Sequence, residues 1–184
     1  LVCAMITSVS IVREKDMGTM AVLLVSPVRP VKIICANTVP YFLISCIVLV
    51  LIMALAQYLL GIPMEGGVAG IFALSILYLV LSLSLGLLVS TIASTQIVAL
   101  LVSAMVMMMP ILMLSGMLFP IENLPVFFKV VSNIVPARWY IDAIRKMMIQ
   151  GESIVAVWKN CAILLGMTVV ILGVSLKKFN DKLE

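Results

Sequence analysis

The sequence contains no histidine and few charged residues. Histidine is the commonest general base, proton relay and metal ligand, so its absence argues against a histidine-dependent enzyme or metal centre. Charged residues make up 11% of the chain, against roughly 25% in an ordinary soluble domain. The hydrophobic fraction is 64%. These values predict an integral membrane protein.

Cysteine and basic residues are also sparse, and their positions argue against disulfides, a metal site and nucleic-acid binding. None of the four cysteines forms a CxxC pair, and Cys46 and Cys161 fall within apolar runs. We expect small apolar side chains in packed helices, not disulfides or a metal site. The net charge of +4 fits basic segments at a membrane face better than nucleic-acid binding, because the basic residues stand beside apolar runs.

Sequence motifs of catalysis are missing. The chain has no GxxxxGK[ST] loop, so it cannot cradle ATP by that route, and it has neither GxSxG nor HExxH. One SxxK occurs at Ser175–Lys178, where an apolar run meets the C-terminal tail, and we do not expect a nucleophile there. We therefore expect no catalytic residue and no enzyme activity in this chain.

Long uncharged runs predict the membrane spans. No charged residue stands between Glu65 and Glu122, and one helix of that length would be about 84 Å long, so the polar cluster at 90–96 is the expected turn. Residues 1–12 are too few to span and lack the basic start of a signal peptide, which we interpret as the end of a truncated helix. The complete spans are predicted at residues 39–60, 68–89, 97–117 and 159–176.

The first break in the apolar pattern covers residues 13–32. It begins with the consecutive charges of Arg13, Glu14, Lys15 and Asp16. Each charge would cost at least a few kcal/mol in hydrocarbon. We therefore expect a structured element at the membrane face that grips another molecule.

The second break, residues 118–157, interleaves apolar residues with charges. Pro125 suits the first turn of a short helix, and Pro136 would start another. In the second helix, Asp142 is spaced i,i+4 from both Arg138 and Lys146, which favours pairing. We expect two short amphipathic helices at, or dipping into, the membrane interface.

Two patterns within the predicted spans each allow two interpretations. The serines and threonines at depth line a path for an amphipathic solute or bond to backbone carbonyls one turn earlier, and we favour the second reading. Six of the fourteen methionines lie between Met105 and Met117, where they form either a soft wall for varied apolar ligands or an ordinary lipid-facing surface.

Two segments in the same order resemble a known family. Residues 13–30, Arg-Glu-Lys-Asp-Met-Gly-Thr-Met-Ala-Val-Leu-Leu-Val-Ser-Pro-Val-Arg-Pro, resemble the cytoplasmic loop of ABC-2 type transporter permeases. Residues 114–125 and 136–145 are similar to that family's extracytoplasmic stretch before the last span. The resemblance covers nearly the whole chain and points to the multidrug-type exporters of bacteria.

The resemblance implies a six-helix permease in the bacterial inner membrane. It implies a second permease copy or homologue, and a separate ATPase subunit that binds ATP and magnesium; no cofactor or metal is expected on this chain. The implied fold is an all-α polytopic membrane protein. It has four complete spans plus the end of a fifth, a cytoplasmic coupling helix at 13–32, extracytoplasmic re-entrant helices at 118–157 and a cytoplasmic tail at 177–184. With this orientation the inside carries seven basic residues and the outside five, the expected bias.

The resemblance also assigns two groups of site residues. In the coupling element, charged residues would pair across the ATPase interface, two leucines would anchor it and the prolines would stiffen its exit. Its residues are Arg13, Glu14, Lys15, Asp16, Gly18, Thr19, Leu23, Leu24, Pro27, Arg29 and Pro30. The outer gate motif would comprise Gly116, Pro120, Pro125, Pro136, Tyr140, Asp142 and Arg145.

We therefore predict the permease subunit of an ATP-binding cassette exporter, which forms the translocation path. A non-transporting membrane anchor for a soluble partner is one alternative, and an ion-driven secondary transporter is another. The transported substrate stays open among drugs, lipid-linked glycans and peptides.

Overall fold

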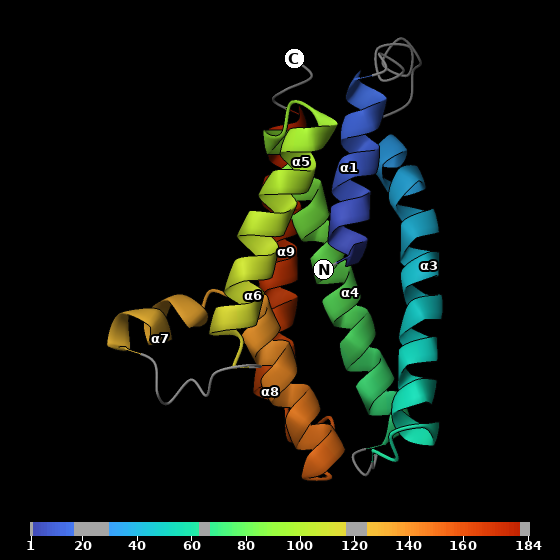
Figure 1. Cartoon of the computed structure of the whole chain (residues 1–184), viewed down its shortest axis with the longest axis vertical. Helices are drawn as coiled ribbons and strands as arrows, with labels where there is room; N and C mark the ends of the chain where they lie inside the picture. Colours follow the sequence, from blue (N-terminus) through green and yellow to red (C-terminus); the bar gives the residue numbers. More distant parts are fainter. Residues whose placement is uncertain (1, 17–29, 63–66, 117–124, 181–184) are drawn as a thin grey trace. The chain divides into compact units, whose positions relative to one another are not determined.

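The computed structural model of the chain describes residues 2–16, 30–62, 67–116 and 125–180, and all regular structure in this part is helical (Figure 1). The all-α prediction is therefore confirmed for these residues. The elements are α1 (Val2–Asp16), α3 (Pro30–Tyr58), α4 (Val68–Ile92), α5 (Gln96–Ser103), a π-helical segment (Ala104–Met108), α6 (Met109–Leu114), α7 (Val126–Ser132), α8 (Pro136–Ile149) and α9 (Trp158–Asn180).

Three of these helices are long and apolar enough to cross a membrane. Their candidate spans coincide with three of the four predicted ones, because each is an apolar run with charges only near its ends. They are Thr38–Tyr58, Val68–Ile92 and Trp158–Lys178. The chain is thus a multi-pass membrane protein.

The span predicted at 97–117 differs from the other three. The backbone is helical from Gln96 to Leu114, but α5, the π-helical segment and α6 divide it, so no single helix there reaches spanning length. The π-helical segment ends just before Pro110. Proline lacks an N–H and crowds the carbonyl four residues earlier, and a π-helical turn can accommodate that defect.

Several helix ends differ from the predicted ones. Helix α3 begins at Pro30, well before 39, and contains Pro40, whereas α4 continues past 89 to Ile92. At the end of α4, Ser90 and Thr91 donate to the carbonyls three residues earlier, so these polar residues stay helical instead of forming the turn. The turn falls after Ile92, and Thr95 caps α5 by accepting from the N–H of Val98.

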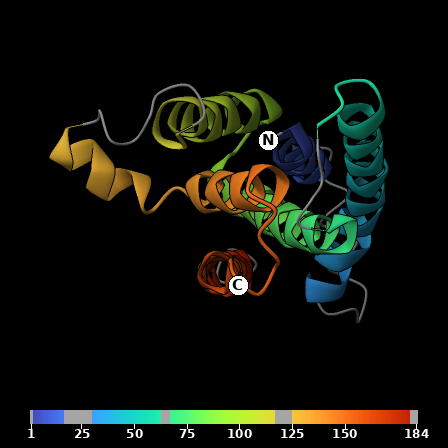
Figure 2. The ribbon, with the colours of Figure 1, turned by 90° about the horizontal axis from the view of Figure 1, so that it is seen from below.

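The chain divides into two compact units, which we describe separately. The first unit consists of Leu1–Ser45, Val80–Met107 and Thr168–Glu184. In it, α1 lies alongside α5, as both views show (Figures 1 and 2). Among the described residues of this unit, Val12 packs with Ala93 and Ala99, and Ile11 packs with Leu87.

The second unit consists of Cys46–Leu79 and Met108–Met167. It contains α7 and α8, and α8 is amphipathic, with Ala137, Ala143 and Met147 on its buried side. Pro136 occupies the first position of α8, as predicted, because its fixed φ suits a helix start. Gly151, with φ 67°, follows the last residues of α8 and ends the helix.

Candidate functional site

Helix α1 carries the charged residues of the predicted coupling element at its C-terminal end, and its other turns are packed. Val12 contacts Ala93 and Ala99, which lie before and within α5, and Val9 packs against the same cluster. Ile11 packs with Leu87 of α4 and with residues of α9, Leu172 and Leu176. Within the first unit, α1 therefore contacts α4, α5 and α9 together.

The contact between α1 and α4 is backbone against backbone. A Cβ atom on Gly86 would lie 2.5 Å from the carbonyl oxygen of Ala4, closer than real Cβ atoms come to an oxygen. Ala4 is 1% exposed. Only glycine permits this approach, so Gly86 fixes where α1 crosses α4.

Polar side chains join α1 to α3. The hydroxyl oxygens of Ser10 and Tyr41 lie 2.5 Å apart, and the Ser45 hydroxyl oxygen lies 2.6 Å from Cys3 Sγ. Such bonds between helices stabilise packing in hydrocarbon, where water is not available to the same groups. Helix α1 thus has contacts to every other spanning helix of the first unit and to α5.

The coupling residues predicted from sequence are only partly described. Arg13 lies exposed on the last turns of α1, and the helix continues through Asp16, so the charges extend α1 instead of starting a separate element. Pro30 is the first residue of α3. The remaining predicted residues lie outside the described part: Gly18, Thr19, Leu23, Leu24, Pro27 and Arg29.

The gate motif centres on α8, which is tied to α7 by Arg138. Its guanidinium donates to the carbonyl of Lys129 at 3.3 Å, to the Ser132 hydroxyl at 2.6 Å and to the Asn133 side-chain oxygen at 2.6 Å. Trp139 adds an indole N–H to the Asn133 carbonyl at 3.0 Å. Of the two predicted pairings of Asp142, the ion pair forms with Lys146, whereas the Arg138 guanidinium bonds at the end of α7 and acts on Asp142 only through its charge.

An aromatic contact ties α8 to α4. The rings of Tyr78 and Tyr140 stack with their centroids 4.3 Å apart and 9° between their planes. The hydroxyls of Tyr140 and Ser75 lie 3.0 Å apart. Burial raises the pKa of Tyr140, and the bond to Ser75 only partly opposes this, so the phenol stays neutral.

A buried amide ties α8 to α9. Asn160, which is 6% exposed, donates from Nδ2 to the Trp139 carbonyl at 3.0 Å and to Asp142 Oδ2 at 2.9 Å. Lys146 Nζ lies 3.0 Å from the same Asp142 oxygen, which is the pairing predicted from sequence. Partial burial opposes ionisation of Asp142, but the bonds from Asn160 and Lys146, with the charges of Lys146 and Arg138, outweigh it and lower its pKa.

Two further contacts complete the surroundings of α8. Arg145 donates to the carbonyl of Gly116 at 3.2 Å, and Gly116, with φ 80°, lies just after α6. A Cβ on Gly70, near the start of α4, would lie 2.8 Å from the end of the Met147 side chain. Within the second unit, α8 therefore contacts α4, α7 and α9 and reaches the end of α6.

The structure thus brings much of the predicted gate motif onto one helix and its contacts. Tyr140, Asp142 and Arg145 all bond from α8, and Pro125 caps α7 instead of lying in its first turn. Pro120 lies outside the described residues. Sequence reasoning did not identify Asn160 or Tyr78 as site residues. For Asn160, the available signal was an amide directly after Trp158 and Lys159, whereas no sequence pattern indicated Tyr78.

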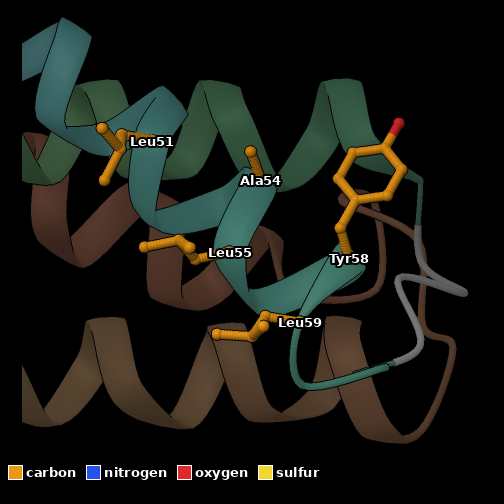
Figure 3. Close-up of a pocket in the computed structure, with 5 residues that line it drawn as sticks. All are labelled: Leu51, Ala54, Leu55, Tyr58 and Leu59. Carbon is orange, nitrogen blue, oxygen red and sulfur yellow. The ribbon is translucent and has the colours of Figure 1, made fainter.

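Three serines of the spans bond to backbone carbonyls, the reading that we favoured, whereas the buried hydroxyl of Ser103 has no hydrogen-bond partner among the described residues. The hydroxyls of Ser45, Ser75 and Ser84 donate to carbonyls four residues earlier, at 2.7, 2.8 and 2.7 Å. An open apolar hollow of about 360 Å³ lies on the last turns of α3 and is lined by Leu51, Ala54, Leu55, Tyr58 and Leu59 (Figure 3). These five side chains come from one stretch of chain, so the hollow is a surface groove and not an enclosed substrate site.

Comparison with known proteins agrees with the resemblance. The sequence model of a family described as "ABC-2 family transporter protein" matches residues 1–177. "Probable multidrug ABC transporter permease YbhS" of Escherichia coli is 29% identical over 181 residues, which are 98% of this chain and 48% of the relative. "Probable multidrug ABC transporter permease YbhR" of the same organism is 31% identical over 84% of this chain and 42% of the relative.

A eukaryotic relative also matches. "ABC transporter G family member 20" of Dictyostelium discoideum is 28% identical over 96% of this chain and 24% of its own length. The chain spans about half the length of the bacterial relatives and less of this one. No solved structure matches the chain significantly.

Proposed function

Because the chain belongs to the ABC-2 family of transporter proteins, we propose that it forms part of the translocation path of an ATP-driven exporter in the inner membrane of a bacterium. Its relatives are named as multidrug ABC transporter permeases. The complete protein pairs with a second permease copy or a homologue, and a separate ATPase subunit binds ATP and magnesium and hydrolyses the ATP.

The packing of α1 is the observation that carries this proposal. Its last turns bear the charged residues Arg13–Asp16, and the turns before them contact α4, α5 and α9 through Ile11 and Val12. A displacement at the charged end therefore reaches several helices of the first unit as a rigid-body shift. Coupling to an ATPase requires such a route.

The segment Gln96–Leu114 serves as a fourth span in this proposal. Its helical backbone is continuous, and its side chains from Ile97 to Met113 are mostly apolar. Exposed apolar side chains occur along its whole length, from Ile97 through Met105 to Met113. At 1.5 Å per residue the segment is nearly long enough to cross the ~30 Å hydrocarbon core. The methionines in it present a soft surface to lipid or to transported molecules.

Helices α7 and α8 serve as the outer gate. Helix α8 contacts α4 and α9, which are both spanning helices, and reaches the end of α6. A helix held to two spans moves when they move. As the family resemblance implies, the coupling element would be cytoplasmic and the gate extracytoplasmic.

The test replaces Leu23 and Leu24 together with Asp in the full-length permease, reconstituted with its ATPase. Charges in place of the apolar anchor prevent docking, so permease-stimulated ATP hydrolysis should fall at least about tenfold while membrane insertion is unchanged. The matched control replaces Leu59 and Leu60 with Asp; these two leucines are likewise adjacent in sequence, and both of their side chains are exposed just after α3.

Three results distinguish the alternatives. Stimulated hydrolysis that survives in the Leu23 and Leu24 variant rules out the proposed docking residues. ATPase recruitment without any substrate movement would favour a membrane anchor. Flux that follows an ion gradient and ignores ATP would favour a secondary transporter.

A further inference from the structure

Asn160 is a buried polar residue for which the proposed function has no separate role. It lies in the first turn of α9 and is 6% exposed. An amide that is buried without hydrogen bonds destabilises a fold. Here the amide nitrogen donates twice, to the Trp139 carbonyl at 3.0 Å and to Asp142 Oδ2 at 2.9 Å.

Both acceptors lie on α8, one helical turn apart. A carbonyl has two lone pairs, so Trp139 can accept from Asn160 as well as within its own helix. Bonds to a charged acceptor such as Asp142 are the stronger kind. Two bonds from one short side chain fix both the distance and the rotation of α8 relative to the start of α9.

The other attachments of α8 are of a different kind. Toward α4, Tyr140 stacks on Tyr78 and Met147 meets Gly70, contacts that can slide or repack, and the hydroxyls of Tyr140 and Ser75 form one bond. Toward α7, Arg138 contacts a helix of only seven residues. Asn160 therefore makes two directional bonds to α8, one of them to a charged acceptor, whereas α4 makes a single hydroxyl–hydroxyl bond to it.

We propose that Asn160 is a positioning residue that makes α8 and the start of α9 move as one piece during the transport cycle, an inference that rests on the proposed function of the chain. The Asn160 side chain does not touch substrate in this role. It sets where α8 lies when α9 shifts.

The chemistry of donation gives a specific test. In Asn160→Asp, an ionised carboxylate cannot donate and faces both a carbonyl and the Asp142 carboxylate. A protonated Asp at this position has one O–H and can restore one bond. The neighbouring carboxylate raises the pKa of the introduced group, so the contact should exist at low pH and be lost as the pH rises through that raised value.

Few other groups can titrate near this contact. Helix α8 contributes Asp142, Lys146, Arg138 and the neutral Tyr140, α9 contributes Lys159 and Cys161 on either side of Asn160 in sequence, and α4 contributes Tyr78. Residues Val68–Ile92 of α4 include no charged residue. In Asn160→Asp, Asp142 loses the bond from Asn160 that helps to lower its pKa but keeps the bond from Lys146 and the charges of Lys146 and Arg138, so the introduced carboxyl is the one expected to hold the proton.

The experiment measures permease-stimulated ATP hydrolysis by the full-length permease with its ATPase in vesicles of phosphatidylethanolamine and phosphatidylglycerol, from about pH 5.5 to about pH 8.5. Each value is divided by that of the wild type at the same pH. Asn160→Asp should approach the wild type at the acid end and fall about fivefold at the alkaline end. Asn160→Leu should be low throughout.

Gln150→Glu is the matched control. Gln150 is exposed just after α8, and the change also converts an amide to an acid. The ATP hydrolysis that the Gln150→Glu permease stimulates should equal that of the wild type at every pH. A profile for Asn160→Asp that is flat, or a wild-type level in Asn160→Leu, overturns the proposal.

A second measurement tests the contact without relying on transport. Spin labels at the exposed positions Ile149 of α8 and Leu165 of α9 report one distance. The distribution should be narrow in the wild type and broad in Asn160→Leu. Equal distributions overturn the proposal even if hydrolysis is stimulated, whereas absent stimulation in the wild type would refute the proposed function alone.

Discussion

At the scale of single residues, Gly86 decides how closely α1 approaches α4. A Cβ there would lie 2.5 Å from the Ala4 carbonyl oxygen, and backbone cannot rotate away as a side chain can. On α9, by contrast, a Cβ on Gly173 would have no atom within 4 Å. These two helical glycines therefore differ in what an added methyl group would meet.

We predict opposite effects for the same substitution at these two positions. Gly86→Ala should lower the free energy of unfolding by about 1–3 kcal/mol, because the added methyl group separates α1 from α4. Gly173→Ala should raise it by up to about 1 kcal/mol, because alanine favours the helix. Thermal unfolding of the purified protein in detergent measures both, and a Gly86→Ala protein as stable as Gly173→Ala would refute the close contact.

Residue-scale contacts were predictable where they are local. The serine bonds to carbonyls four residues earlier and the Asp142–Lys146 pair depend only on helical spacing. Arg138 obeys the same spacing, yet its partners lie in and just after α7. The partners of Arg138 and the role of Asn160 cannot be predicted from the spacing of residues in the sequence, because both depend on which helices pack together.

At the scale of elements, α7 exposes almost its whole apolar surface. Val126, Phe127, Phe128 and Val130 are 77, 72, 45 and 61% exposed. The helix has only seven residues and its end is held by Arg138. In a protein that spans a membrane, such a helix fits the boundary between head groups and acyl chains.

We predict that replacing Phe127 and Phe128 with Ser withdraws α7 from lipid. Trp139, whose indole bonds just after α7, serves as the reporter in a background where Trp158 is replaced by Phe. Quenching of its fluorescence by lipids brominated near the head groups should weaken about twofold. Val155→Ser, a change at another exposed apolar residue, is the control and should leave quenching unchanged. Equal quenching in both variants and the parent would place α7 away from lipid.

A helix can be predicted from this sequence more readily when its apolar run is longer. The three candidate spans follow from uninterrupted hydrophobic sequence, and Pro136 marks the start of α8. The π-helical segment was not predicted, although Pro110 lies within the proposed fourth span. A proline signals a defect in a helix, but packing decides whether a kink, a break or a π-helical turn absorbs it.

At the scale of the whole molecule, each unit is organised around one helix. Helix α1 is central to the first unit and bears the predicted coupling charges, and α8 is central to the second and bears the gate motif. The sequence predicted a membrane protein and the two motifs. The sequence could not predict that α1 and α8 are the central helices of their units, because their positions depend on contacts between residues far apart in the chain.

The account depends on the charged end of α1 facing the cytoplasm and contacting an ATPase. The direct measurement places a single cysteine at Arg13 of the full-length protein, with the native cysteines replaced by Ser, and applies a membrane-impermeant maleimide. The account predicts labelling in inverted vesicles, none in intact cells, and protection in the vesicles when the ATPase is added. Labelling from the outside of intact cells, or labelling that the ATPase does not affect, would contradict it.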